Sequence, residues 1–362
     1  MKKIIFTVTN DLSYDQRMER ICNTLSNAKY DIELVGRVKK HSIPLTKKSY
    51  HQNRLHCFFQ KGKLFYIEYN IRLFFYLLFK RADVISSVDL DTIFPCILVS
   101  KIRSKKIVFD AHEYFTEVPE VTNRKLIKFI WETVAKLCIP QVNAAYTVGD
   151  SLAEIFTKKY HKNFEVIRNV STLSNHQIIK SSPEKIILYQ GDLNEARGLE
   201  QMIDAMKNIE AEFWIAGDGL LSEKLKQLAI NFKVDSKVKF LGYLKPEQLK
   251  MLTEKATIGI NILENKGLSY YYSLANKFFD YIHAGVPQIC APFPEYENIN
   301  SQFNVALLCD CDVPQIIHSI NLLLQDETLY KKMQEDCLKA KEFFNWQNEE
   351  KKLLKIYADV CK

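Results

Sequence analysis

The chain has 362 residues, more than a single hydrophobic core usually supports, so two domains are expected. Hydrophobic residues make up 47% and aromatic residues 12%, a composition that excludes a disordered chain. The net charge of +7 is unevenly spread, since fifteen lysines and arginines stand against four carboxylates between Arg37 and Lys106. A basic first half favours an anionic surface or substrate as its partner.

The cysteines and the N-terminus indicate a cytoplasmic protein without a metal centre. Nine cysteines occur with no CxxC pair, and the CxC of Cys309 and Cys311 lacks neighbouring ligands, so we expect reduced thiols and no metal site. The opening MKKIIFTVTND is too short for a signal peptide and predicts a buried strand. The sequence contains no run of eighteen apolar residues and therefore predicts no transmembrane helix.

Short apolar runs of strand type alternate with helical patterns along the chain, which is typical of parallel sheets covered by helices. The predicted strands are Lys3–Val8, Asp31–Val35, Asp83–Ser87, Lys106–Asp110, Ala145–Val148, Phe164–Ile167, Lys185–Gln190, Glu212–Ala216, Val238–Leu241, Ile258–Ile262, Gln288–Cys290 and Ala306–Leu308. A polar, turn-rich stretch separates the sixth strand from the seventh, so two sheets are expected.

The predicted fold class is α/β, with two Rossmann-like doubly wound parallel-sheet domains that face each other across a cleft. We expect an N-terminal domain over residues 1–168, a linker over 169–183 and a C-terminal domain over 184–335. Residues 336–362 form a predicted helical tail that packs back across the domain boundary. Ligands of such sheets bind beyond the carboxyl ends of the strands, so the loops there hold the candidate site residues.

Two segments near the N-terminus each admit two interpretations. In TNDLSYDQRMER, the first strand-to-helix loop, Asn10, Asp15 and Arg17 can face an acceptor or a nucleotide, and a helix-capping role for Asp15 is equally open. The basic-flanked helix KGKLFYIEYNIRLFFYLLFKR, residues 61–81, has too many apolar residues for one soluble face. It is predicted either to lie on anionic lipid or to form part of the domain core.

VFDAHEYFTEVPE brings Asp110, His112 and Glu113 to the carboxyl end of a buried strand, where functional residues are expected. The alternative for His112 is a loop histidine whose hydrogen bonds are satisfied locally. The DLD sequence of Asp89 to Asp91 lies in the same half, and a metal role for its two carboxylates is not favoured.

The second half contains two strand-to-helix loops suited to phosphate. In YQGDLNEARGLE, Gly191 ends a strand and Arg197 opens a helix, where a guanidinium beside free backbone amides can hold a diphosphate. In FWIAGDGLLSEKL, Gly217, Asp218 and Gly219 form a turn that lets a phosphate approach the backbone. The alternatives are a solvent-facing arginine and an ordinary tight turn.

A third loop and helix, SYYYSLANKFFDYIHAGVPQICA, follows at residues 269–291. Ser273 is predicted to cap a helix that begins near Leu274 and places Asn276, Lys277 and Asp280 on one exposed face. The lysine could neutralise phosphate, and the carboxylate could accept hydrogen bonds from ribose hydroxyls. The alternative is a solvated ion pair between Lys277 and Asp280.

Taken in order, Arg197-Gly198, Gly217-Asp218-Gly219, FLGYL and NKFFDYIHAGVPQI resemble the nucleotide-sugar domain of bacterial retaining GT-B glycosyltransferases of family 4, the glycosyl transferases group 1. The resemblance covers residues 185–309, with a looser likeness over 1–168. It implies that the N-terminal domain binds the acceptor and the C-terminal domain the nucleotide sugar.

The resemblance also implies roles for single residues. His112 matches a histidine that faces the donor sugar near its reacting carbon, and Asp280 matches an acidic residue that binds the ribose. Tyr272 stands where the family has another glutamate, which usually touches the donor sugar. Asp192 stands where many relatives carry a basic diphosphate ligand, so this chain departs from the family at both positions.

The predicted function is therefore metal-independent transfer of a hexosyl or N-acetylhexosaminyl group from a UDP- or GDP-sugar, with retention of configuration. His112, Arg197 and Lys277 are the predicted catalytic residues. The donor-binding residues are Gly191, Gly217, Asp218, Gly219, Tyr272, Ser273, Leu274, Asn276 and Asp280. Asn10, Asp15, Arg17 and Glu113 are placed on the acceptor side.

We expect a lipid-linked saccharide acceptor in cell-surface polysaccharide synthesis, no cofactor, and no nucleic-acid partner. The basic N-terminal domain is predicted to contact the inner face of the cytoplasmic membrane peripherally. A GT-B nucleotide-sugar epimerase and a non-catalytic nucleotide-binding module remain as alternatives. A nicotinamide oxidoreductase is not favoured, because no GxGxxG follows the first strand.

Overall fold

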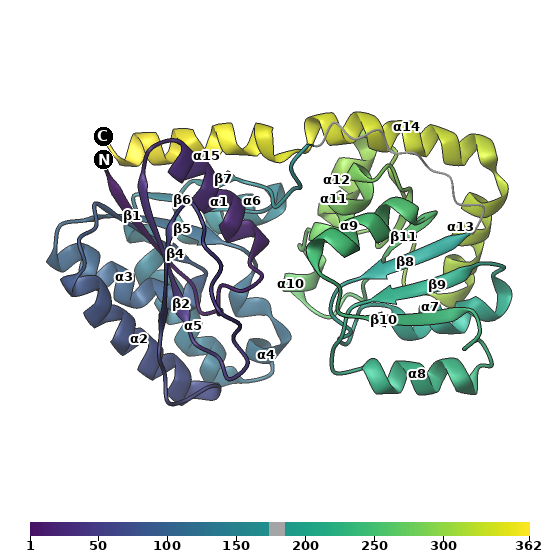
Figure 1. Ribbon diagram of the computed structural model, residues 1–362, viewed down its shortest axis with the longest axis horizontal. Coiled ribbons are helices and arrows are strands. Elements are labelled where there is room, and N and C mark those ends of the chain that lie inside the picture. The colour runs from purple at the N-terminus through teal and green to yellow at the C-terminus, as the bar shows by residue number, and fades with distance from the viewer. Residues whose placement is uncertain (174–184) are drawn as a thin grey trace. The chain divides into compact units, whose positions relative to one another are not determined.

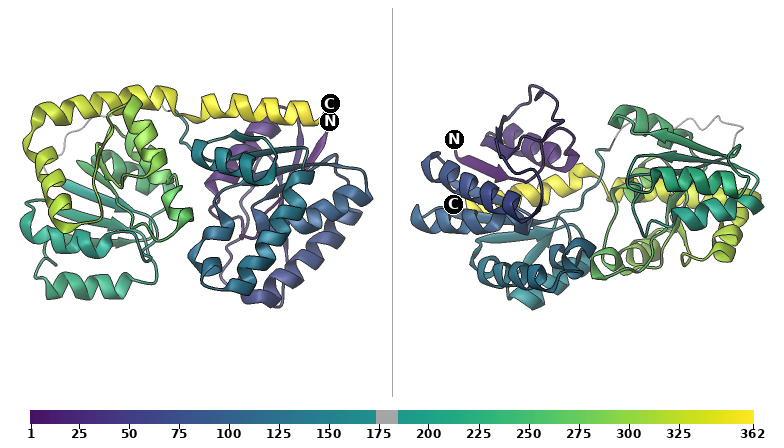
Figure 2. Two further views of the ribbon diagram at one scale, coloured as in Figure 1. Left: turned by 180° about the vertical axis from the view of Figure 1, so that it is seen from behind. Right: turned by 90° about the horizontal axis from the view of Figure 1, so that it is seen from below.

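The computed structural model describes residues 1–173 and 185–362, and these residues form two compact units (Figure 1). The first unit comprises Met1–Asn169 together with Asn348–Lys362, and the second comprises Val170–Gln347. The last segment of the chain therefore returns to the unit that contains the N-terminus, and the two termini lie near each other in every view (Figures 1 and 2). Most of the predicted linker, residues 174–183, lies outside the described residues.

The first unit is built on a parallel sheet of seven strands in the order β3-β2-β1-β4-β5-β6-β7. Its strands are β1 Lys3–Thr7, β2 Asp31–Arg37, β3 His51–Leu55, β4 Val84–Val88, β5 Lys106–Ala111, β6 Ala144–Thr147 and β7 Phe164–Val166. The six strands predicted in this half are present. The pattern does not predict β3, whose HQNRL sequence is polar because this edge strand pairs only with β2 and stays partly exposed.

Helices cover both faces of this sheet (Figure 1). They are α1 Gln16–Asn27, α2 Gly62–Phe79, α3 Leu90–Ile102, α4 Pro119–Thr122, α5 Lys125–Cys138, α6 Asp150–Tyr160 and α15 Trp346–Val360, with the 3-10 turns η1 Phe115–Glu117 and η2 Ile139–Gln141. Neighbouring residues of β1 point to opposite faces. Phe6 contacts Tyr357 of α15, whereas Thr7 hydrogen-bonds Thr92 of α3.

The second unit repeats this plan with six parallel strands in the order β10-β9-β8-β11-β12-β13. They are β8 Ile186–Gln190, β9 Glu212–Ala216, β10 Val238–Gly242, β11 Ile258–Asn261, β12 Gln288–Cys290 and β13 Ala306–Leu308, and all six were predicted. The helices are α7 Leu199–Ala205, α8 Ser222–Asn231, α9 Pro246–Lys255, α10 Leu268–Tyr271, α11 Asn276–His283, α12 Pro294–Gln302, α13 Val313–Gln325 and α14 Glu327–Phe343, with the turn η3 Met206–Asn208.

Both units thus have the Rossmann-like, doubly wound order, which confirms the predicted fold class of two parallel-sheet domains. In the second unit Phe278, Phe279 and Ile282 of α11 are buried in the core. Among the described helices, none is both long and apolar enough to cross a bilayer. The strand order reverses between β1 and β4 in the first sheet and between β8 and β11 in the second, and the candidate site residues lie at or near the carboxyl ends of these and the adjacent strands.

Candidate functional site

The site in the second unit lies at the strand-order reversal between β8 and β11. The loop after β8 carries Arg197, and the chain after β11 leads through α10 to Lys277 at the start of α11. β8 and β11 are paired, and at such a reversal the connections that follow the two strands leave a crevice beyond their carboxyl ends, so side chains from both loops can approach the same ligand. Two segments about eighty positions apart in sequence are brought together in this way.

Glycines let the loops after β8 and β9 pack directly on each other. A Cβ added to Gly217 would lie 1.9 Å from the carbonyl oxygen of Gly191, and one on Gly219 would lie 2.6 Å from the carbonyl oxygen of Leu193. The two loops are joined by hydrogen bonds from the Gly191 amide to the Ala216 oxygen, 3.0 Å, and from the Leu193 amide to the Asp218 oxygen, 3.0 Å. The glycine pattern thus has a packing reason that needs no phosphate.

The Asp218 side chain has a local role in this turn. Its Oδ1 accepts hydrogen bonds from the Gly219 amide, 2.8 Å, and from the Ser222 hydroxyl. These hydrogen bonds lower the pKa of Asp218. The carboxylate therefore stabilises the start of α8, and its predicted contact with a donor stays a prediction.

The start of α11 differs from the prediction. The helix begins at Asn276 after Ala275, not near Leu274, and Ser273 does not cap it. Instead the Ser273 hydroxyl donates to the carbonyl oxygen of Tyr270, 2.7 Å. The Ala275 amide donates to the Tyr296 hydroxyl, 3.1 Å, so a tyrosine from α12 holds the N-terminal end of the helix.

The residues before α11 divide between core and surface. Leu274 is buried in the hydrophobic core, whereas Asn276 is exposed on the first turn. The Tyr272 ring packs edge-on against Tyr271, with 5.0 Å between ring centroids. Leu274 is therefore poorly placed for direct ligand contact through its side chain, while Tyr272 and Asn276 retain some exposed surface.

Lys277 is buried, so the prediction that it lies on an exposed helix face is wrong, and the alternative of a solvated ion pair with Asp280 is wrong as well. Its side chain is 8% exposed, and its Nζ lies 3.8 Å from the centroid of the Tyr189 ring on β8. Burial lowers the pKa of Lys277 well below its ordinary value, and the nearby positive charge of Arg197 lowers it further. The carboxylate of Asp192 opposes this effect less strongly.

Arg197 lies at the other side of the same site. It precedes Gly198, whose backbone has φ of +66° before α7, and its guanidinium lies 5.0 Å from the centroid of the Tyr270 ring. Within residues 1–173 and 185–362, neither Arg197 nor Lys277 forms an ion pair with a carboxylate. Two neighbouring basic side chains that form no ion pair with a carboxylate among the described residues suit a doubly charged anion.

Asp280 is anchored beside these cations. Its Oδ1 accepts from the Ser171 hydroxyl, 2.9 Å, and its Oδ2 accepts from Gln190 Nε2, 2.8 Å. Gln190 in turn accepts from the Thr253 hydroxyl, 2.8 Å. Each carboxylate oxygen can accept more than one hydrogen bond, so the anchored group can still bind hydroxyls of a ligand.

The first unit contains a second polar cluster, formed at the carboxyl ends of β4 and β5. His112 Nε2 lies 2.9 Å from Asp110 Oδ2, and its Nδ1 lies 3.6 Å from Asp89 Oδ2. The His112 amide also donates to Asp89 Oδ1, 2.8 Å. Asp89 adopts φ of +56°, a left-handed value that is costly for a residue with a Cβ.

This cluster keeps the histidine protonated. Burial disfavours the imidazolium, but Asp110 and Asp89 prevail and raise the pKa of His112 to about 9. Burial likewise opposes ionisation of Asp110, yet the cations of Arg17 and His112 lower its pKa to about 2. At neutral pH His112 therefore carries a fixed positive charge and is a poor general base.

The residues predicted on the acceptor side have different environments. Arg17 is 4% exposed and bonds to Asp110, 2.9 Å, and to the Ile167 carbonyl oxygen, 2.9 Å, so the expectation that it faces an acceptor is not supported. Asp15 caps α1 by accepting from the Met18 amide, 2.9 Å, which is the alternative left open above. Asn10 Nδ2 donates to the Asp15 carboxylate, 2.6 Å.

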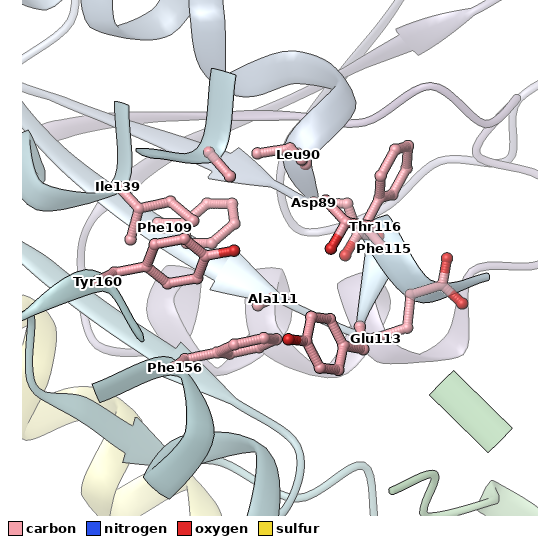
Figure 3. A pocket seen from close by; sticks show the side chains of 12 residues that line it. Asp89, Leu90, Phe109, Ala111, Glu113, Phe115, Thr116, Ile139, Phe156 and Tyr160 are labelled. Atoms are coloured by element: carbon pink, nitrogen blue, oxygen red, sulfur yellow. The ribbon is translucent and has the colours of Figure 1, made fainter. Parts of the chain in front are cut away.

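A small pocket adjoins the cluster, between β5 and the segment that follows it (Figure 3). Its volume is about 20 Å³, enough for about one water molecule but not for a sugar. Phe109, Phe156 and Tyr160 line it, and the Glu113 carboxylate points away from these rings in Figure 3. Glu113 is exposed, as an acceptor-facing residue needs to be.

Three residues that support the site are not identified from the sequence pattern. Asp89 holds His112, Tyr189 contacts Lys277, and Gln190 anchors Asp280. Their common signal is a polar or aromatic residue at the carboxyl end of a central strand, which is the place where such folds bind ligands.

Comparison with known proteins bears on both units. Residues 171–340 match the model of the family described as glycosyl transferases group 1. An uncharacterized glycosyltransferase of Methanocaldococcus jannaschii is 37% identical over 79 residues. That match spans 21% of this chain and 20% of the relative, so it covers about a fifth of each protein.

Solved structures of similar fold extend over almost the whole chain. Sucrose-phosphate synthase from Thermosynechococcus elongatus has a TM-score of 0.80 at 14% identity and covers 99% of both chains. HepE of Anabaena, in complex with UDP and glucose, has a TM-score of 0.77 at 13% identity over 99% of this chain and 100% of its own. WaaG, a glycosyltransferase involved in lipopolysaccharide biosynthesis, has a TM-score of 0.76 at 13% identity over 98% and 99%. At these identities the likeness shows the fold alone.

Proposed function

We propose that the protein transfers a sugar from a nucleoside diphosphate donor to a saccharide acceptor, because residues 171–340 match the model of the glycosyl transferases group 1 family. The observation that carries the proposal is the pair Arg197 and Lys277, two neighbouring cations without a carboxylate partner among the described residues. The diphosphate of a nucleotide sugar supplies the negative charge that this pair lacks.

Transfer of the sugar leaves a nucleoside diphosphate, whose charge grows as the glycosidic bond breaks. Arg197 and Lys277 are placed to stabilise that developing charge, and stabilisation of the leaving group lowers the barrier. Burial of Lys277 makes its charge more effective, because little water screens it. The departing diphosphate can accept the proton of the acceptor hydroxyl, so this step needs no metal ion.

We assign the donor's ribose to Asp280. Its carboxylate is held by Ser171 and Gln190, 2.9 Å and 2.8 Å away, and a carboxylate oxygen can accept more than one hydrogen bond. The proposed donor is a UDP- or GDP-sugar of hexosyl or N-acetylhexosaminyl type. HepE, which shares this fold, was solved in complex with UDP and glucose, and the likeness favours UDP as the first nucleotide to test.

His112 is proposed to act as a cation near the sugar, since its pKa of about 9 keeps it protonated. The family resemblance supports retention of the anomeric configuration. A lipid-linked acceptor in cell-surface polysaccharide synthesis at the inner face of the cytoplasmic membrane is proposed from the basic first unit, and the fold of WaaG supports that choice.

The test is a thermal-shift and calorimetric screen of UDP, GDP and their sugars, each with and without EDTA. Stabilisation by one nucleotide family that persists in EDTA is the expected result. The nuclear magnetic resonance spectrum of the product then distinguishes transfer with retention from epimerisation of the donor. No response to any nucleotide would contradict the donor site, and loss of the response in EDTA would contradict the metal-free step.

A further inference from the structure

The helix α2 is apolar on two opposite faces. Phe65, Tyr69, Leu73 and Leu77 are buried against the rest of the first unit. Ile67, Ile71, Phe75 and Phe79 each lie two residues further along, about 200° around the helix, and all four are exposed. The predicted core role of this helix accounts for the first set only. A helix that is apolar all round in a water-soluble unit indicates a second partner.

The exposed face of α2 continues into a groove. Its floor is α3, through Phe94, Pro95 and Leu98, and its walls are α2 and α5. The rings of Tyr66 on α2 and Trp131 on α5 meet edge-on at 5.6 Å and join the two walls. The groove has a volume of about 620 Å³ and is lined almost wholly by apolar side chains.

Exposed apolar residues surround the groove on all three helices. They are Leu64, Ile67, Ile71, Phe75 and Phe79 of α2, Phe94, Leu98 and Ile102 of α3, and Leu126, Phe129, Ile130 and Leu137 of α5. So large an apolar face is unusual on the surface of a soluble protein and marks an interaction site. We call these residues, together with the groove, the α2–α3–α5 face.

The charged residues of the three helical segments favour an anionic partner. Residues 61–81, 90–103 and 124–138 contain eleven lysines and arginines and three carboxylates. Two of the three carboxylates are engaged within the protein, since Glu68 pairs with Arg72 at 2.8 Å and Asp91 accepts from the Thr9 hydroxyl at 2.6 Å. Lys63 and Arg124 lie directly at the groove. The groove is thus apolar, and the three segments that surround it are strongly basic.

We propose that the α2–α3–α5 face docks on an anionic lipid bilayer and that a lipid hydrocarbon chain enters the groove. Insertion of the exposed isoleucines and phenylalanines into the acyl region lowers the free energy, and the cations contact the anionic headgroups. A second copy of the chain is the less favourable occupant, because a two-fold interface would bring the same cations against each other. The proposal rests on the proposed function, since it gives a lipid-linked acceptor its place beside the enzyme.

The experiment is co-sedimentation of the full chain with vesicles of phosphatidylcholine, with or without phosphatidylglycerol. Ile71→Asp tests the face, and Ile230→Asp on α8 is the matched control, because the two isoleucines are 53% and 56% exposed on helices. Ile71→Asp should lower partitioning into anionic vesicles about tenfold or more, whereas the control should bind like the wild type. Ile67→Gln, a milder change, should weaken binding if Ile71→Asp proves unstable.

Charge and oligomeric state are tested separately. Lys63→Glu and Arg124→Glu should each weaken binding to anionic vesicles at least about fivefold, and high salt should weaken wild-type binding. The proposal would be overturned if the Ile71→Asp variant bound anionic vesicles as tightly as the Ile230→Asp variant. The proposal would also be overturned if the wild type were a dimer that did not bind vesicles and the Ile71→Asp substitution converted it to a monomer. The thermal shift with nucleotides is measured on the same samples, so failure of the donor site is seen independently of vesicle binding.

Discussion

Replacing Lys277 with methionine should weaken nucleotide binding and stabilise the free protein at the same time. Methionine keeps an unbranched, flexible side chain of similar length, so it can occupy the space beside the Tyr189 ring, 3.8 Å from the present ammonium. In the free protein the change removes a buried amine that forms no ion pair with a carboxylate among the described residues. In the complex it removes a cation from the diphosphate.

The two effects have different sizes. A hydrogen bond to a charged group contributes about 1.5–3 kcal/mol, so the dissociation constant for the nucleoside diphosphate should rise about 10- to 150-fold. Removal of this buried polar group should raise the free energy of unfolding of the second unit by about 1 kcal/mol. For a unit of this size that corresponds to an increase in Tm of about 2–4 °C.

Isothermal titration calorimetry measures the first effect, and thermal unfolding without ligand measures the second. Lys207→Met is the matched control, because Lys207 also lies over an aromatic ring, Phe232 at 4.4 Å, but is exposed and paired with Asp204. The control should change neither quantity appreciably. Unaltered affinity in Lys277→Met, or a lower Tm of its free form, would refute the assignment of Lys277 to a buried anion site.

Four further outcomes are expected. Nucleotide binding should take up protons at pH values between the lowered pKa of free Lys277 and its ordinary value of 10.5, and affinity should fall as pH rises through that window. Calorimetry in buffers of different ionisation enthalpy measures the uptake, and its absence would mean that binding does not change the protonation of Lys277. His112 should titrate near pH 9 in nuclear magnetic resonance spectra, and Asp89→Asn should lower that pKa. Protonated His112 should contribute its full stabilisation below pH 6.5 and lose it as the pH rises to about 9. Unfolding of the wild type and of His112→Gln at both ends of this range will test the change in stability. Asp15→Ala should cost about 1 kcal/mol by removing the cap of α1, with Asp15→Asn as the conservative control in denaturant unfolding. Gly217→Ala should lower Tm by several degrees, since its Cβ would lie 1.9 Å from the Gly191 oxygen, and an unchanged Tm would show that the two loops can separate freely.

The sequence determines the architecture because its signals are local. Runs of apolar residues in the central strands, such as Lys3–Thr7, and the helical patterns between them require only neighbours in the chain, so all twelve predicted strands are present. The polar β3, His51–Leu55, has no such signal, since it becomes a strand only by pairing with β2. The residue types at the site, including Arg197 and Asp280, also follow from motifs at the ends of strands.

Only the tertiary structure decides what surrounds those residues. Lys277 is buried because α11 packs against β8, where Tyr189 lies 88 positions earlier in the chain, and no local pattern contains that contact. Arg17 likewise takes its place from Asp110, 93 positions later. Helical spacing places side chains on a common face, but burial of a charge depends on which distant strand covers that face. The surroundings of Arg197 and Lys277 therefore depend on the folded sheet, although the motifs already predict which residue types occur at the site.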